Sequence, residues 1–180
     1  MERVILARHG ETVWNVERRV NGDPSQDVHL SASGREESRR LGEELEGEAL
    51  DLCVTTPFRR TQETADLALA DRPDAVPRLV VPELGDPRYG DFEGLGLDDY
   101  RAWARAQASS VAPPGGGESR RQVAARYAVG FRRLLDRPET AILAVCHSLP
   151  IAYALGARDG SPPEPRAPMI ANAHPYPFAR

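Results

Sequence analysis

Short apolar runs alternate with longer amphipathic segments along most of this 180-residue chain. The runs at residues 4–7, 52–54, 79–81 and 141–145 have the length and composition of buried strands. Segments with helical spacing lie between them, and this alternation is typical of an α/β fold. We therefore predict a three-layer αβα sandwich with a mostly parallel central sheet, formed by a single domain over residues 1–180.

The segments between these runs have helical patterns. Ser31 or Ser33 can cap a helix that runs through Leu41 and Leu45 toward Gly47. The clearest helix carries one apolar stripe, formed by Val123, Tyr127, Phe131 and Leu134. The other expected elements are helices at residues 61–70, 96–108 and 149–155, and an edge strand at residues 169–171.

Composition excludes several classes of protein. The net charge is −4, which gives no broad nucleic-acid footprint, and the sequence has no lysine, so arginine and histidine must build any anion site. No apolar stretch approaches the roughly 20 residues that a membrane span needs, and the first residues do not form a signal peptide. We expect a soluble cytoplasmic protein. Cys53 and Cys146 lie in apolar runs, so we expect buried strand residues and no disulfide or zinc site.

Cationic side chains and histidines follow three of the predicted strands. His9 comes after the first strand and His147 after the strand at residues 141–145, while Arg60 lies just beyond the second. Ligands of open α/β sheets bind at the carboxyl ends of the strands, and arginine forks together with helix N-termini favour phosphate. These residues, with Arg8 beside His9, predict an anion site. Taken singly, each also fits a structural role, such as a hydrogen-bonded histidine or a solvated helix start.

The string Arg8-His9-Gly10-Glu11-Thr12, with Asn15, resembles the signature of the histidine phosphatase superfamily, the phosphoglycerate mutase-like proteins. Further segments match the pattern of that family in the same order. They are residues 29–34, 55–65, 89–94, 114–119 and 145–148. The resemblance covers residues 4 to about 151, which is most of the chain.

This resemblance implies a mechanism. His9 would attack phosphorus and form a phosphohistidine that water then hydrolyses. Arg8, Arg60 and His147 would hold the phosphoryl oxygens, and Asn15 would be a further donor to the phosphate. Arginine and histidine would replace a metal ion as the charge clamp, so we expect neither a metal nor another cofactor.

The general acid departs from the family pattern. The family has a glutamate four residues before the glycine that here is Gly90, and this position holds Asp86. Aspartate is one methylene shorter but can still protonate a leaving oxygen if the loop moves inward. Glu83 lies three residues upstream and is the alternative acid. We favour Asp86 from the motif register.

We expect a phosphatase that acts on a small phosphorylated molecule, because the link from Gly94 to Pro113 leaves little room for the lid of a mutase. Three alternatives stay open: phosphoglycerate mutase activity, binding of a phosphorylated ligand without turnover, and, less favoured, a metal hydrolase on His9 and His147. The loops at residues 16–29 and 95–117 are expected to set specificity. His29 and His174 are placed outside the site, and the oligomeric state is open.

Overall fold

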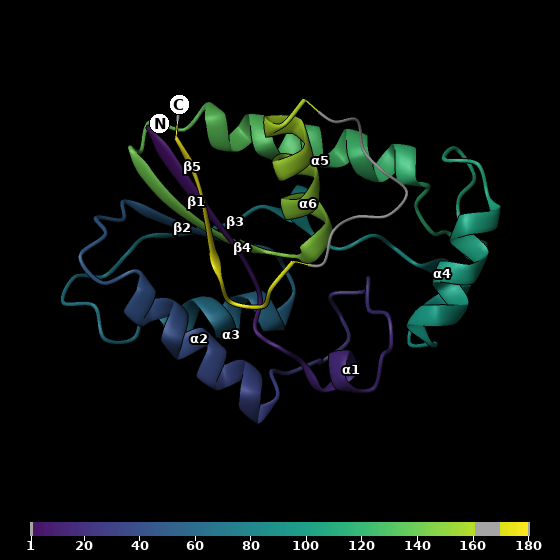
Figure 1. Ribbon diagram of the computed structural model, residues 1–180, viewed down its shortest axis with the longest axis horizontal. Helices are drawn as coiled ribbons and strands as arrows, with labels where there is room; N and C mark the ends of the chain where they lie inside the picture. Colours follow the sequence, from purple (N-terminus) through teal and green to yellow (C-terminus); the bar gives the residue numbers. More distant parts are fainter. Residues whose placement is uncertain (1, 161–169, 180) are drawn as a thin grey trace.

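The structure is a computed structural model that describes residues 2–160 and 170–179. Within these residues a five-stranded sheet has the strand order β3-β2-β4-β1-β5 (Figure 1). β1 pairs with β4 in parallel, β2 pairs in parallel with both β4 and β3, and β5 is antiparallel to β1. The predicted mostly parallel sheet is therefore confirmed. The strands are β1 (Arg3–Arg8), β2 (Leu52–Thr55), β3 (Arg78–Val80), β4 (Ala141–Cys146) and β5 (Pro175–Ala179).

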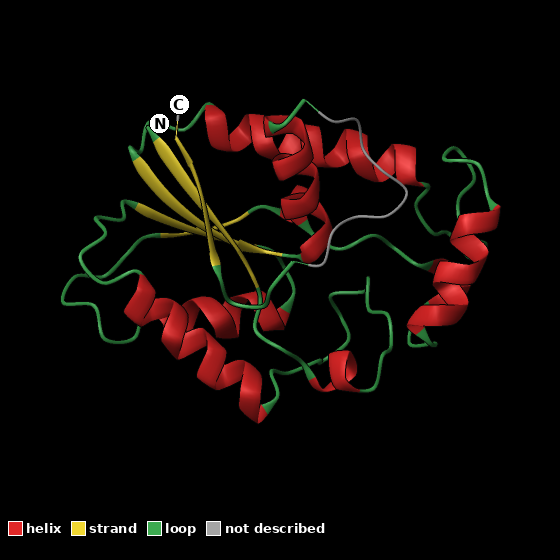
Figure 2. Ribbon diagram, viewed as in Figure 1, coloured by secondary structure: helices red, strands yellow, loops and turns green. Residues whose placement is uncertain are grey.

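Helices cover both faces of this sheet (Figure 2). α2 and α3 lie on one face and α5 and α6 on the other, whereas α4 lies away from the sheet (Figure 1). This arrangement confirms the three-layer prediction. The helices are α1 (Val13–Val16), α2 (Ala32–Glu44), α3 (Arg59–Ala68), α4 (Leu97–Ala106), α5 (Arg120–Leu135) and α6 (Ser148–Arg158), with 3-10 turns η1 (Pro82–Leu84) and η2 (Gly90–Phe92).

Alternation along the strands divides the core into two halves. Val4 and Leu6 of β1 pack into the cluster that includes Leu134 and Ile151 from α5 and α6. The intervening residues of β1 pack with α2 and α3 on the opposite face, because successive side chains of a strand point to opposite sides. Cys146 belongs to the first half and Cys53 to the second, and both are buried free thiols, as predicted.

The pairing register of β1 and β4 determines which residues lie together at the carboxyl ends of these strands. β1 and β4 pair along their whole length and end together, so that Ala7 lies opposite Val145 and Arg8 lies opposite Cys146. The next residue of β1, His9, donates its backbone N–H to the carbonyl of Cys146 at 3.0 Å. The residues that directly follow the two strands, His9 and His147, are consequently neighbours at one edge of the sheet.

The structure decides between the two candidate caps of α2. Ser31 is the N-cap, and its hydroxyl accepts a hydrogen bond from the N–H of Gly34 at 3.0 Å. Ser33 lies inside the helix and is exposed. At α5 the N-cap is Ser119, which forms a capping box with Gln122. Glu118 does not cap α5; its carboxylate binds Arg126 instead.

The predicted edge strand at residues 169–171 is wrong in place. Met169 lies outside the described residues, and Ile170 and Ala171 are not in a strand. The edge strand is β5, although it contains Pro175 and Pro177. Proline is tolerated in an edge strand, since one side of that strand has no ladder hydrogen bonds to lose.

Three short elements were not predicted: α1 and the 3-10 turns η1 and η2. α1 is only four residues long, and a capping box between Thr12 and Asn15 stabilises its start.

Among the described residues, no helix combines the length and the apolar character that crossing a bilayer requires. The single-domain organisation and the cytoplasmic location remain predictions.

Candidate active site

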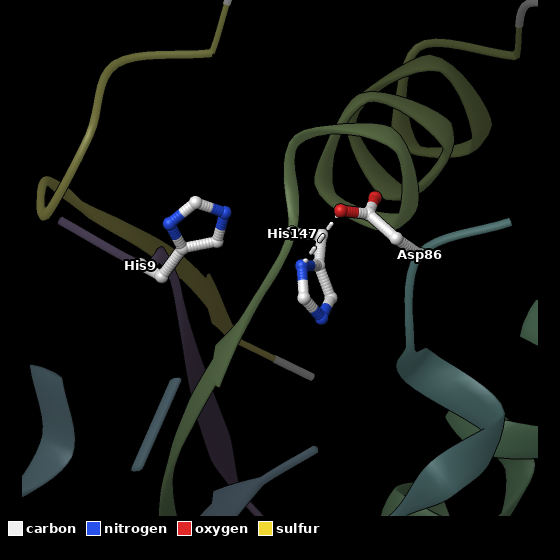
Figure 3. A group of neighbouring side chains, drawn as sticks. All are labelled: His9, Asp86 and His147. Atoms are coloured by element: carbon white, nitrogen blue, oxygen red, sulfur yellow. Dashed lines mark ion pairs between the residues drawn. The ribbon is translucent and has the colours of Figure 1, made fainter. Parts of the chain in front are cut away.

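His9 and His147 face each other at the carboxyl ends of β1 and β4. Their rings meet edge to face with centroids 5.3 Å apart, and both side chains are buried. Figure 3 shows the two imidazoles with Asp86 beyond His147, each from a different segment of the chain. The predicted convergence of strand ends on one spot is thus present in the structure.

The hydrogen bonds of His9 define the state of its ring. Nδ1 lies 2.7 Å from the carbonyl oxygen of Gly10, which can only accept, so Nδ1 carries the hydrogen. Nε2 then has the free lone pair, and it accepts a hydrogen bond from Nε of Arg60 at 3.1 Å. Nε2 is therefore the nitrogen of His9 that is able to act as a nucleophile.

Arg60 connects the groups of the site. It lies in the first turn of α3, is buried, and stacks over the ring of Phe58 at 4.3 Å. Its Nη2 donates to Oδ2 of Asp86 at 2.7 Å and to the carbonyl of Asn21 at 3.1 Å. Nη1 donates to the side-chain oxygen of Asn21. A fixed guanidinium beside the lone pair of His9 suits an anion that approaches that nitrogen.

Asp86 reaches the site from the loop between η1 and η2. Its Oδ2 lies 3.1 Å from Nδ1 of His147 (Figure 3). The same oxygen accepts a hydrogen bond from Arg60. Glu83, the alternative acid, instead pairs with Arg133 of α5 through oxygens at 2.9 and 3.0 Å. The structure therefore places Asp86 against both the histidine pair and Arg60, and it directs the carboxylate of Glu83 toward α5.

His147 is held from its second nitrogen as well. Nε2 lies 3.0 Å from the hydroxyl of Thr56, which in turn lies 3.0 Å from the hydroxyl of Thr61. Phe58 packs edge to face on the imidazole, with centroids 4.8 Å apart. These contacts fix the ring plane so that Nδ1 points at Asp86.

Burial and neighbouring charge set the protonation states. Burial, followed by the cationic Arg60, the His147 ring and Arg8, lowers the pKa of His9 well below its ordinary value, so His9 is neutral. Burial acts to raise the pKa of Asp86, but His147 and Arg60 outweigh burial and hold that pKa well below the usual carboxyl range. The site therefore combines a neutral imidazole with an ionised carboxylate.

Arg8 and Asn15 complete the predicted set. Arg8 donates from Nη1 to the carbonyl of Ile170 at 2.8 Å, and its buried Nε has no acceptor among the residues that the structure describes. Burial lowers the pKa of Arg8, and so does the charge of Arg60. Asn15 accepts the N–H of Thr12 at its Oδ1 (3.0 Å), within the capping box of α1.

Several residues of the site were not predicted. Asn21 accepts from Arg60, Thr56 contacts His147, and Asn172 donates to the carbonyl of His9 at 3.0 Å. Each lies far from its partner in sequence. Thr56 belongs to the segment 55–65 that matches the family pattern, whereas Asn21 and Asn172 lie outside the matching segments. Arg18, in the loop at residues 16–29 that was expected to set specificity, pairs with Asp98.

The same groups can be tested as a metal site. One ligand atom from each of His9, Asp86 and His147 lies within 4.8 Å of the other two. However, Arg60 donates to Nε2 of His9 and to Oδ2 of Asp86, the atoms that a metal ion would need. A fixed guanidinium among the ligand atoms repels a cation, so these residues fit an anion better than a metal.

A cleft of about 500 Å³ adjoins Asp86. Its lining is rich in carboxylates and also contains two arginines, one of them already paired with a buried glutamate. The charged residues of the lining are Asp23, Glu83, Asp86, Glu93, Glu118, Arg88 and Arg126. Three of these carboxylates are paired with arginines: Asp86 with Arg60, Glu83 with Arg133 and Glu118 with Arg126.

Curated proteins of similar sequence include mutases and a phosphatase. A 2,3-bisphosphoglycerate-dependent phosphoglycerate mutase of Methylobacterium sp. (strain 4-46) is 37% identical over 137 residues, which cover 70% of this chain and 64% of the mutase. The chain thus spans less than two thirds of that relative. A protein described as the uncharacterized phosphatase PhoE of Bacillus subtilis (strain 168) is 27% identical over 174 residues, covering 96% of this chain and 86% of the phosphatase.

Solved structures show the same fold. The structure of YhfR from Bacillus stearothermophilus superposes with a TM-score of 0.83 at 30% identity, covering 97% of this chain and 89% of YhfR. The family described as the histidine phosphatase superfamily (branch 1) matches residues 4–175. With its paired histidines, its buried arginine and this match, the chain belongs to the histidine phosphatase superfamily.

Proposed function

We propose that this protein is a metal-independent phosphatase that hydrolyses phosphomonoesters through a phosphohistidine on His9. The observation that carries the proposal is the state of His9: Nδ1 is bound to the carbonyl of Gly10, and the lone pair of Nε2 points at Arg60. A buried, neutral imidazole with a fixed tautomer beside a guanidinium has the properties of a nucleophile for phosphorus.

The reaction has two steps. Nε2 of His9 attacks phosphorus in line, the bond from phosphorus to the ester oxygen breaks, and Asp86 gives its proton to that oxygen. Water then attacks the phosphohistidine, Asp86 takes the proton of the water, and the bond between phosphorus and Nε2 breaks. Arg8, Arg60 and His147 hold the equatorial oxygens, where negative charge concentrates.

Asp86 needs a proton for the first step. Its low pKa depends in part on Arg60, which binds it directly at 2.7 Å. A phosphate that draws Arg60 away and adds negative charge beside Asp86 raises the pKa of this carboxyl. Substrate binding and protonation of the acid are thereby coupled.

Phosphoglycerate mutase activity is the second candidate, because curated relatives with this activity match 70% of the chain. We favour a phosphatase, because the link from Gly94 to Pro113 is short and leaves little room for the lid of a mutase. We expect no efficient interconversion of 2- and 3-phosphoglycerate after priming with the bisphosphate. Efficient interconversion would reassign the protein as a mutase.

The first experiment is hydrolysis of p-nitrophenyl phosphate in the presence of EDTA by the wild type and by His9→Ala. We expect activity that EDTA does not change, and a loss of at least about a thousandfold in His9→Ala. His174→Ala, which alters an exposed histidine outside the site, is the matched control and should keep full activity.

Rapid acid and alkaline quenching of wild-type turnover should reveal a phosphoenzyme that is labile in acid and stable in base, as a phosphohistidine is. Loss of activity with EDTA, or activity retained by His9→Ala, would contradict the proposal. A folded wild type that binds phosphate but turns over no ester would indicate a phospho-ligand-binding protein.

A further inference from the structure

The loop that carries Asp86 belongs to no strand, and a single arginine of α5 binds its backbone. Arg126 donates from Nη1 to the carbonyls of Glu83 at 2.8 Å and Gly85 at 2.9 Å. Its Nη2 donates to the carbonyl of Asp86 itself at 3.2 Å. One guanidinium thus binds three carbonyls within four consecutive residues, and the last of these belongs to Asp86.

Glu118 fixes that guanidinium. Its two carboxylate oxygens accept from Nε and Nη2 of Arg126, each at 2.9 Å, which is a bidentate pair. Glu118 is 6% exposed, so water screens the pair little. Because the guanidinium is planar, this bidentate pair fixes its orientation. The N–H groups of Arg126 that are not bound to Glu118 therefore point toward the loop.

The same glutamate holds the loop on the other side of Asp86. Oε2 of Glu118 accepts the N–H of Arg88 at 3.0 Å, and the N–H of Glu118 donates to the carbonyl of Arg88 at 2.8 Å. The neighbouring segment adds a backbone bond from Asp91 to the carbonyl of Pro114 at 2.9 Å. The chain is thus held just before and just after the aspartate.

This support matters because aspartate is short. Asp86 has one methylene fewer than glutamate, so the backbone must bring its carboxyl within 3.1 Å of His147 and 2.7 Å of Arg60. A displacement of about 1 Å at a catalytic group costs up to about a hundredfold in rate. Holding the backbone of this loop is therefore a direct way to hold the acid.

We propose that Arg126 and Glu118 are positioning residues that place Asp86 for protonation of the leaving oxygen. The inference rests on the proposed function, in which Asp86 is the general acid. Neither residue touches the phosphoryl group in this scheme. Both act only through the position of Asp86, and this makes their effect depend on how much the leaving group needs a proton.

The test compares two substrates in Arg126→Met, Arg126→Lys and Glu118→Gln. An alkyl ester such as β-glycerophosphate has a basic leaving oxygen and needs the acid, whereas p-nitrophenyl phosphate needs it far less. We expect kcat/KM for the alkyl ester to fall about 10- to 100-fold, with a change below about threefold for p-nitrophenyl phosphate. Arg126→Lys keeps the charge but loses the fork, so it should behave like Arg126→Met.

Arg137→Met is the matched control, because it removes an arginine–glutamate pair beyond the far end of α5 that does not contact the acid loop. Its activity on both substrates should be unchanged. In the double variant Asp86→Asn with Arg126→Met, the alkyl ester should lose no more than with Asp86→Asn alone, because Arg126 acts through Asp86.

Two outcomes would overturn the positioning role. One is an equal loss on both substrates in folded Arg126 variants, and the other is no loss on either substrate. These results differ from failure of the proposed function, which would appear as an inactive wild type or as a wild type whose activity does not require His9. If Asp86→Asn discriminates between the substrates and Arg126→Met does not, the acid stands and the positioning role fails.

Discussion

At the scale of single residues, two nearby carboxylates have different partners. Asp86 lies against His147 and Arg60, while Glu83 is paired with Arg133. The two residues are three positions apart, but the 3-10 turn η1 and the following loop direct them to different neighbours. A short side chain in the site is consistent with a loop that comes close to the histidines.

We predict that Asp86→Asn lowers kcat for an alkyl phosphate by about 10²- to 10⁴-fold, the usual contribution of a general acid. Glu83→Gln should stay within about threefold of the wild type, because its carboxylate pairs with Arg133. Steady-state kinetics on both variants is the measurement. An unimpaired Asp86→Asn together with a severe loss in Glu83→Gln would exchange the two roles.

At the scale of elements, the loop after β1 packs directly on the first turn of α2. A Cβ on Gly34 would lie 2.0 Å from the carbonyl oxygen of Glu11, and one on Gly10 would lie 2.3 Å from the carbonyl oxygen of Gly34. Two glycines therefore allow the backbone beside His9 to touch the helix. Gly10 also donates its N–H to Thr64 of α3 at 2.9 Å, so two helices hold this loop.

This contact decides whether Gly34→Ala stabilises or destabilises the protein. Alanine is a better helix former than glycine by about 1 kcal/mol, which alone would make Gly34→Ala stabilising. Forcing a methyl group into a packed contact costs about 1–3 kcal/mol, and here the obstacle is backbone. We predict a net destabilisation in urea unfolding and a reduced kcat, because His9 is displaced. Ser33→Ala, at an exposed position of the same helix, should be neutral or slightly stabilising, and a more stable Gly34→Ala would refute the close approach.

At the scale of the whole molecule, the buried histidines couple stability to pH. Burial lowers the folded-state pKa of both His9 and His147. In the unfolded chain a histidine has its ordinary pKa of about 6.5. As the pH falls below that value, the unfolded chain therefore binds protons at these histidines while the folded chain does not. The stability tied to these histidines is present above about pH 6.5 and is lost below it. Asp86, whose pKa is lowered, loses its own contribution only at much lower pH.

We predict that the free energy of unfolding falls below about pH 6.5 with a slope of up to about 1.4 kcal/mol per pH unit for each histidine. Glu93, whose pKa burial raises, acts with the opposite sign. Comparing the wild type with His9→Gln isolates the contribution of His9. Between about pH 5 and 6, the free energy of unfolding of this variant should change less steeply with pH than that of the wild type. Denaturant unfolding at a series of pH values measures it, and identical slopes would show that His9 does not carry this linkage.

The sequence by itself determined the layered α/β fold and the two histidines at its strand ends. The apolar runs of β1 and β4 are local signals of burial, and a residue that follows such a run lies at the edge of the sheet wherever the strand is placed. For the same reason Arg60 could be assigned to a helix start. These features depend only on neighbours in the chain.

The tertiary structure decided what depends on distant contacts. It placed β4 beside β1, brought Asp86 and not Glu83 to His147, and added Thr56 to the site. It also formed the edge strand from residues with two prolines, because pairing with β1 outweighed their low strand propensity. Hydrogen bonds between residues tens of positions apart follow from register and loop path, and local patterns in the chain do not encode either of these.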